Sequence, residues 1–564
     1  MLIPVIDLFA GPGGLGEGLS RAKRVDFRTV ISIEKDEMAA CTLTLRAAHR
    51  ALERSLKGLD PQEVDEVWKT WDRLIEVSDW QETLKQLRTQ GGTLIAEACG
   101  EASREALKFE LGPDRRTEAT QIIKKRLQSY TPDGSLPKNA VLIGGPPCQA
   151  YSLVGRARNR GKEDYRAEED HRHFLYKEYL QVIAEFRPAV FVMENVKGLL
   201  TSTIEGARIF ESIKSDLRHP GRVCGVPDRE GYVLVSLMKG ADGTSPTPQE
   251  PAAEEFIVRT EALGLPQARH RVIICGIRED VFKLAGCRVG TLMVTPPTDV
   301  RDVVVDLPKL RPALSWRGNG ASWLSSFKSP MFDEAIVELQ RSDDPDRRWI
   351  ATRMLRAVAE MTGVDPLSGA ERLKVGLHSA PNAHRAWYAD RTVRVLANHE
   401  SRSHMPEDLV RYLFVSAYGQ QMEMSPRLSD FPMALLPNHR NVDPENVSAA
   451  IFKDRFRVQV FDSHSTTVTS HIGKDGHAFI HPDPAQCRSL TVREAARLQT
   501  FSDSYVFLGN RTSQYTQVGN AVPPMLATRI GDVIGEVLFK AKMAEARLAI
   551  SEPAPACNSE AILL

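Results

Sequence analysis

The sequence of 564 residues contains no apolar run of the length, about eighteen residues, that a membrane-spanning helix needs. Its first residues pass from a short apolar stretch directly into a glycine-rich turn, without the basic segment and the cleavage site of a secretory signal. We therefore expect a protein that is neither secreted nor inserted in a membrane, and we expect it in the cytoplasm.

Paired cysteines and an excess of one charge are also missing. The 8 cysteines are scattered without a CxxC pair, which argues against a zinc knuckle and against a disulfide framework. Lys plus Arg and Asp plus Glu both number 73 and the pI is near 7.2, a balance that disfavours a nucleic-acid coat protein but is compatible with local basic patches. The composition, with 42% apolar and 26% charged residues, is that of an ordinary globular protein long enough for about two to four domains.

In much of the first half of the chain, short apolar segments alternate with segments whose apolar residues have helical spacing. This alternation is typical of a doubly wound α/β sheet of the Rossmann type. Residues 47–130 instead show helical spacing with a stripe of Val and Trp, which we interpret as a helical insertion whose stripe packs in its own core rather than on a partner. The sequence predicts strands at 3–9, 29–33, 140–143, 189–193, 232–238 and 272–277, and a helix at 174–186.

The second half of the chain is organised differently. The alternation fades after about residue 289, and residues 240–255 read as a loop because they are rich in Pro, Gly and Ser. A helix signal returns near Ser489, where Thr491 and Glu494 have the spacing of a capping box. We divide the chain into units at 1–285, 290–487 and 488–545, followed by a flexible tail at 551–564.

A glycine-rich turn follows the first predicted strand. Gly11, Gly13 and Gly16 fit the pattern G-x-G-x-x-G, and Glu34 closes the next strand, where a carboxylate can accept the hydroxyl groups of a ribose. The pattern suits a nicotinamide enzyme, a flavin enzyme or a methyltransferase, because each brings backbone close to a nucleoside cofactor. A tight turn with a purely structural role is the alternative.

A cysteine follows the predicted strand 140–143, at the edge of the sheet where α/β proteins place their ligands. Pro146 and Pro147 restrict the backbone immediately before Cys148, which indicates a thiol presented in one geometry. We interpret Cys148 as a nucleophile; the alternative is an inert buried cysteine.

Charged residues mark two further strands. Glu194 and Asn195 follow the predicted strand 189–193, where the alternative to a functional carboxylate is a structural one bonded to backbone amides. Arg269 and Arg271 alternate as they enter the strand 272–277 and so share one face. Surface salt bridges are the alternative for the two arginines.

Taken together and in order, these segments resemble the DNA cytosine-5 methyltransferases. The resemblance covers roughly residues 1–46, 138–285 and 488–540. The matching segments are DLFAGPGG (7–14), GGPPCQAYS (144–152), MENVKG (193–198), QARHRV (267–272), LTVREAARLQTF (490–501) and QVGNAVPP (517–524).

The resemblance implies covalent catalysis on cytosine. Cys148 would add to carbon 6 of the base. Glu194 would protonate ring nitrogen 3 if burial keeps it protonated, and Asn195 would orient the loop. Arg269 and Arg271 would hold the cysteine loop and a phosphate or the carbonyl oxygen of the base.

The resemblance also implies S-adenosylmethionine as the methyl donor and no metal. The family's acidic contact to the adenine amino group has no counterpart that the sequence identifies, because the helical insertion occupies that part of the chain. The residues that would surround the donor are Phe9, Gly11, Gly13, Gly14, Glu34, Leu175, Asn520 and Val522.

The implied substrate is double-stranded DNA of a specific sequence, with the target base flipped out of the helix. Residues 1–285 and 488–545 would then form the catalytic domain and 290–487 the target-recognition domain. The basic loop 151–172 would close on phosphate, unless it is only a solvated charged loop. We expect a bacterial enzyme, in a restriction-modification system with a companion endonuclease or in an orphan role.

Several alternatives stay open. A tRNA cytosine-5 methyltransferase would share the fold, but its Cys-Phe-Thr signature is absent. A nicotinamide oxidoreductase leaves the proline and cysteine segment unexplained, and a non-catalytic DNA-binding protein leaves the intact cysteine, glutamate and arginines unexplained. His399 and His404 lack a third ligand at suitable spacing, so we expect them to form hydrogen bonds or face DNA rather than bind a metal.

Overall fold

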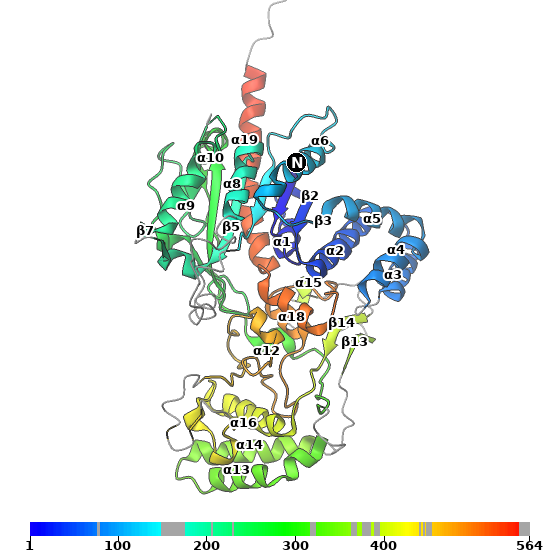
Figure 1. Cartoon of the computed structure of the whole chain (residues 1–564), viewed down its shortest axis with the longest axis vertical. Helices are drawn as coiled ribbons and strands as arrows, with labels where there is room; N and C mark the ends of the chain where they lie inside the picture. Colours follow the sequence, from blue (N-terminus) through cyan, green and yellow to red (C-terminus); the bar gives the residue numbers. More distant parts are fainter. Residues whose placement is uncertain are drawn as a thin grey trace, which may run out of the picture.

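The computed structural model describes residues 1–75, 79–147, 175–204, 207–227, 230–315, 323–361, 369–374, 385–388, 395–438, 442–443, 446 and 454–551. A mixed eight-stranded sheet forms the centre of the upper body in Figure 1, in the order β10-β11-β5-β4-β1-β2-β3 with β8 paired to β11. Its strands are β1 (Leu2–Leu8), β2 (Asp26–Glu34), β3 (Ala106–Lys108), β4 (Val141–Gly144), β5 (Val190–Val196), β8 (Tyr232–Val235), β10 (Ile257–Arg259) and β11 (His270–Arg278).

Strands β1 to β5 run parallel, and β11 runs antiparallel to β5. The strand order reverses at β1, which lies between β2 and β4, and α/β proteins bind their ligands at such a switch point. Each of the six predicted strands falls on a strand of this sheet, so the predicted Rossmann-like α/β fold is confirmed.

Helices cover both faces of the sheet. One face packs against α1 (Gly14–Leu19), α11 (Glu279–Leu284) and α19 (Pro524–Ser551). The other packs against α6 (Arg116–Gln128), α8 (Leu175–Phe186) and α9 (Ile209–Arg218), and α8 confirms the predicted helix 174–186. Because α19 comes from the far end of the chain, the C-terminal segment completes the core of the first half.

Helices α2 (Glu37–Ser55), α3 (Pro61–Leu74), α4 (Trp80–Gln90) and α5 (Gly92–Glu105) form a separate bundle beside the sheet (Figure 1). Trp68 and Trp71 are buried in its core, which confirms that the stripe packs internally. The range expected to be helical also contains the strand β3, which extends the central sheet beyond β2. Three residues are too few to show a strand period in the sequence.

A second unit lies at the lower end of the molecule in Figure 1, where α13 (Pro330–Gln340), α14 (Pro345–Met361) and α16 (Pro406–Met422) share one core. Between this unit and the sheet, α12 (Val300–Val304), α17 (Val492–Leu498) and α18 (Arg511–Asn520) form another core. At the start of α17, the Glu494 N–H donates to Thr491 and the Thr491 N–H donates to the Glu494 side chain, which confirms the capping box.

No helix within the described ranges is long and apolar enough to cross a membrane.

The remaining described elements are short. The elements are β6 (Thr203–Ile204), β7 (Ala207–Arg208), α10 (Pro220–Cys224), β9 (Ala241–Asp242), β12 (Arg288–Val289), β13 (Gly369–Lys374), α15 (Arg385–Tyr388), β14 (Val395–Glu400) and 3-10 turns at Pro113–Arg115, Lys197–Thr201, Ala253–Phe256, Trp323–Lys328, Leu428–Asp430, Met433–Leu435 and Ser470–Gly473.

Two buried histidines predict that acid destabilises this fold. His399 Nε2 lies 2.9 Å from the carbonyl oxygen of Pro308, and the Ser489 N–H donates to His404 Nε2 at 3.3 Å. Burial lowers the pKa of His399 to about 4 and that of His404 to about 3. The unfolded chain therefore takes up these protons first, so the stability gained from the neutral rings is complete above about pH 6.5 and is lost as the pH falls toward 4.

We expect the free energy of unfolding in urea to fall by roughly 3 kcal/mol or more between pH 6.5 and pH 4 on account of these rings. The double variant His399→Gln/His404→Gln should show a shallower fall over the same range, although carboxylates contribute to the fall in both proteins. An identical slope in the two proteins would contradict the assignment.

Candidate active site

The carboxyl ends of four neighbouring strands meet at one edge of the sheet. Leu8 at the end of β1 is in register with Ile33 of β2 and with Gly144 of β4, and Gly144 is in register with Met193 of β5. Glu34 is the last residue of β2, Glu194 and Asn195 lie near the end of β5, and the glycine turn follows β1, so the fold brings these predicted site residues to the same edge.

The glycine turn after β1 is determined by backbone geometry. Gly11 and Gly13 have φ of 57° and 98°, in the left-handed region that favours glycine, and Phe9 has φ of 56°. A Cβ atom on Gly14 would lie 2.1 Å from the carbonyl oxygen of Val522, so only glycine fits there. At Gly11, by contrast, a Cβ atom would meet no atom of the described residues within 4 Å, so among these residues the backbone there faces open space.

Glu34 ties this turn to the end of β2. One carboxylate oxygen accepts from the N–H of Gly11 and the other from the N–H of Asp36, both at 2.8 Å. Burial raises the pKa of Glu34. Each carboxylate oxygen keeps a further lone pair, so Glu34 can also accept the hydroxyl groups of a ribose placed in the open space at Gly11. These features fit a nucleoside cofactor.

The end of β3 supplies two residues that the sequence did not identify. The Phe109 N–H donates to the backbone carbonyl of Glu34 at 2.8 Å, and Glu110 forms an ion pair with Lys35 at 3.1 Å. Both residues therefore lie next to Glu34 at the carboxyl edge of the sheet. A strand of three residues after a long helical bundle gives no sequence signal that would have revealed them.

Glu194 and Arg271 form the second part of the site. Glu194 Oε1 lies 2.8 Å from Arg271 Nε, and each side chain is 14% exposed, so the pair is largely enclosed but reachable. The Asn195 side-chain amide donates to the carbonyl oxygen of Pro146 at 3.0 Å. A Cβ atom on Gly145 would lie 3.0 Å from Glu194 Oε2, so Glu194 lies against the segment that leads to Cys148.

Cys148 and the basic loop 151–172 lie outside the described residues. The segment immediately before the cysteine is described, and Asn195 fixes it at Pro146. Asn195 also accepts the N–H of Val196 through its side-chain oxygen at 2.9 Å, so both ends of its amide are used.

Arg269 has a different environment from Arg271. It is 2% exposed, and its Nη1 donates to the carbonyl oxygens of Val468 at 2.9 Å and Gly519 at 3.1 Å. Among the described residues Arg269 has no acidic ion-pair partner, and the ion pair of Arg271 is with the largely enclosed Glu194 rather than at the surface. Arg271 orients Glu194, whereas Arg269 binds two backbone segments of the C-terminal part together.

The other predicted residues have distinct positions. Val522 is buried and its carbonyl faces Gly14, Asn520 is the exposed last residue of α18, and Leu175 is the first residue of α8. His399 contacts Thr491 and Pro308, and within the described ranges no three His, Cys, Asp or Glu side chains are grouped in a way that could hold a metal ion.

Comparison with known proteins gives two consistent findings. A family model described as C-5 cytosine-specific DNA methylase matches residues 115–223 and 378–536. A type II methyltransferase of Bacillus paralicheniformis is 31% identical over 546 residues, which cover 95% of this chain and 99% of that protein. The chain belongs to the C-5 cytosine-specific DNA methylase family.

Other relatives agree with this assignment. A type II methyltransferase of Thalassovita gelatinovora is 25% identical over 410 residues, covering 70% of this chain and 82% of the relative. A DNA (cytosine-5-)-methyltransferase of Aeropyrum pernix is 26% identical over 441 residues, covering 71% and 81%. The predicted resemblance and enzyme class are thus confirmed.

The position of Arg269 predicts a structural effect on the methyltransferase. In Arg269→Met the buried carbonyl groups of Val468 and Gly519 lose their donor, so we expect the free energy of unfolding to fall by about 2–4 kcal/mol. The exposed Arg259, on the neighbouring strand β10, provides the control Arg259→Met. Urea unfolding measures both variants, and equal stability of the two would contradict the role.

Proposed function

We propose that the chain transfers a methyl group to carbon 5 of a flipped cytosine in a specific double-stranded DNA sequence, through a transient bond between Cys148 and the base. S-adenosylmethionine is the proposed methyl donor. The observation that carries the proposal is the arrangement of Glu194, Arg271 and Asn195 against the segment that leads to Cys148.

The chemistry follows from the poor reactivity of cytosine. Carbon 5 is a weak nucleophile, so the Cys148 thiolate first adds to carbon 6 while Glu194, oriented by Arg271, gives a proton to nitrogen 3. Bound S-adenosylmethionine would supply an electrophilic methyl group to carbon 5, with cleavage of the bond between the methyl carbon and the sulfonium sulfur and release of S-adenosylhomocysteine. A base then removes the proton from carbon 5, the thiolate leaves carbon 6 as the ring double bond forms again, and the proton on nitrogen 3 returns to Glu194.

The cofactor would lie over Gly11 with its ribose at Glu34, because the backbone at Gly11 faces open space and the carboxylate retains acceptor capacity. We place the adenine end beside Phe109 and Glu110, which follow β3 next to Glu34. The remaining proposed contacts are Phe9, Gly13, Gly14, Leu175, Asn520 and Val522.

DNA is the substrate that the description of the family and the name of the Aeropyrum pernix relative support. We propose that residues 290–487 recognise the target sequence, that the loop 151–172 binds phosphate, and that 1–285 and 488–545 form the catalytic domain, with 551–564 as a tail. The type II relatives support a bacterial modification role, with a companion endonuclease that acts on the same site as a proposed partner.

The thiol is tested by Cys148→Ala, with Cys224→Ala as a matched control because Cys224 is a partly exposed free cysteine elsewhere on the sheet domain. We expect the first variant to lose methylation of DNA, read by bisulfite sequencing, while it still binds S-adenosylmethionine. Wild-type protein should form a covalent adduct with DNA that contains 5-fluorocytosine. Methylation by Cys148→Ala, or an adduct at another peptide in mass spectrometry, would refute the assignment.

Glu194→Gln removes the proposed proton donor but keeps the size of the side chain. We expect turnover to fall by about two to four orders of magnitude, the scale of a lost general acid. The control is Glu261→Gln. Glu261 pairs at 2.7 Å with His270, which precedes Arg271 on β11. Single-turnover methylation rates are measured for both variants and for the wild type. A wild-type rate in Glu194→Gln would exclude Glu194 from the mechanism.

A further inference from the structure

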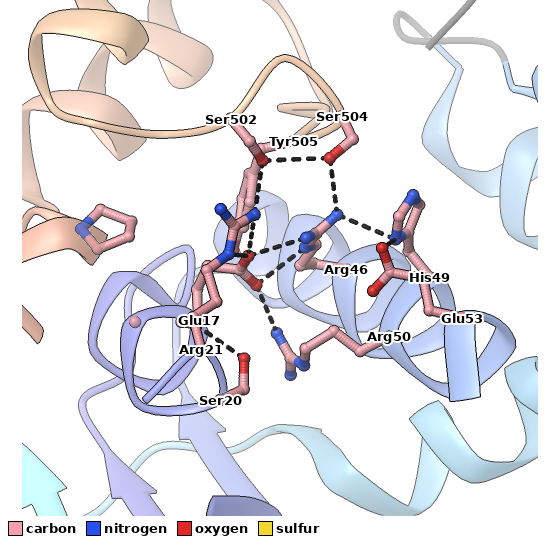
Figure 2. Close-up of polar contacts among 12 residues, drawn as sticks. Glu17, Ser20, Arg21, Arg46, His49, Arg50, Glu53, Ser502, Ser504 and Tyr505 are labelled. Carbon is pink, nitrogen blue, oxygen red and sulfur yellow. Dashed lines mark hydrogen bonds and ion pairs between the residues drawn. The ribbon is translucent and has the colours of Figure 1, made fainter. Parts of the chain in front are cut away.

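One carboxylate beneath the glycine turn is surrounded by three arginines (Figure 2). Glu17 of α1 accepts from Arg46 Nε at 2.9 Å and Nη2 at 2.8 Å, from Arg50 Nη1 at 3.2 Å and from Arg21 Nε at 2.9 Å. We call these four residues the Glu17 cluster. Glu17 is 2% exposed, so its charge is stabilised almost entirely by these guanidinium groups.

The arginines of the Glu17 cluster also bind two other segments of the chain. Arg50 pairs with Glu105 at the end of α5 at 2.5 Å. Arg46 donates to Ser504 at 3.3 Å, and Arg21 donates to Ser502 at 2.9 Å. Glu17 is therefore the point at which α1, the helical bundle and the C-terminal segment 502–505 are joined (Figure 2).

The Glu17 cluster is directly connected to the glycine turn. The Glu17 N–H donates to the carbonyl oxygen of Gly13 at 2.9 Å. The Tyr505 hydroxyl, on the segment that Arg46 and Arg21 contact, donates to the carbonyl oxygen of Pro12. The turn is thus fixed from below by Glu17 and from the side by Tyr505, and a shift of either would move the backbone at Gly11.

The charge on Glu17 is needed for this arrangement. Burial opposes its ionisation, but the charges of Arg46 and Arg21 outweigh burial and hold the pKa of Glu17 well below its usual range. Removing the charge would take away the carboxylate that forms the ion pair of Arg46, which is 4% exposed. The guanidinium groups would then reorient, and the backbone that they fix would move with them.

We propose that Glu17 is a positioning residue for S-adenosylmethionine, which sets the affinity of the glycine turn for the cofactor through Arg46 and Arg50 of α2. The inference rests on the cofactor assigned under the proposed function and adds a determinant of its binding. The proton-donating pair of Glu194 and Arg271 lies at the ends of β5 and β11, and neither residue is a partner of Glu17. The effect should therefore fall on cofactor affinity and leave the methyl-transfer step unchanged.

The test is isothermal titration of the full chain with S-adenosylmethionine in the absence of DNA, together with steady-state methylation. For Glu17→Gln we expect the Kd to rise about tenfold or more, with the binding stoichiometry unchanged and kcat at saturating cofactor within about threefold of wild type. Glu82→Gln is the matched control, because Glu82 forms an exposed ion pair with Lys85 on α4 at 3.2 Å and should bind as wild type does.

The stoichiometry separates positioning from loss of folded protein. A variant that is partly unfolded binds less cofactor per chain with an unchanged Kd, and that result for Glu17→Gln would overturn the inference. Ser504→Ala, which removes a single hydroxyl contact of Arg46, keeps the test informative if Glu17→Gln does not fold. It should raise the Kd to a smaller extent, and a wild-type Kd there would also count against the inference.

The titration of the wild-type chain with S-adenosylmethionine tests the proposed function itself. If the wild-type chain itself does not bind S-adenosylmethionine, the cofactor assignment fails before the role of Glu17 is examined. If wild type and Glu17→Gln bind equally well, the cofactor assignment stands and the positioning role is refuted.

Discussion

The proposed site depends on the close approach of the glycine turn to the segment 519–522. At Gly14 no side chain fits, because a Cβ atom would lie 2.1 Å from the carbonyl oxygen of Val522. The same segment is held by Arg269, which donates to the carbonyl of Gly519, and it continues into α19, which packs on the sheet. Residues about 500 positions apart therefore lie together at the edge where we propose that the cofactor binds.

Buried charge is used in two different ways around this edge. Glu17 is almost completely enclosed, and three arginines use its lone pairs, so its ionisation supports the backbone and has no capacity left for a substrate. Glu194 has Arg271 as its ionic partner and is 14% exposed. Its Oε2 faces Gly145, in the segment before Cys148. The number of partners and the exposure distinguish Glu17, whose lone pairs are all used, from Glu194, to which we assign the proposed chemistry.

The parts of the fold that depend on local pattern could be predicted from the sequence. The strands, the helix at 174–186 and the capping box of Thr491 and Glu494 have periodic or capping signals within a few residues, and the structure confirms them. The strand β3 was missed because three residues carry no period. The environments of Glu17 and Arg269 could not be predicted, because their partners are distant in sequence and are set by how helices and loops dock.

The position of the helical bundle explains why so many charges are buried next to the glycine turn. The bundle is inserted between β2 and β3, two adjacent strands whose ends flank the proposed cofactor: α2 begins shortly after Glu34, and Glu105 of α5 immediately precedes β3. A long insertion at such a place would transmit its motion to both strands unless its first and last helices were fixed together. Arg50 does this by pairing with Glu105 and with Glu17 at once, so the ends of the insertion are joined to the helix that follows the glycine turn. The first and last helices of the insertion thus share both an apolar core and an ion-pair network, and the network alone extends to the helix that follows the glycine turn.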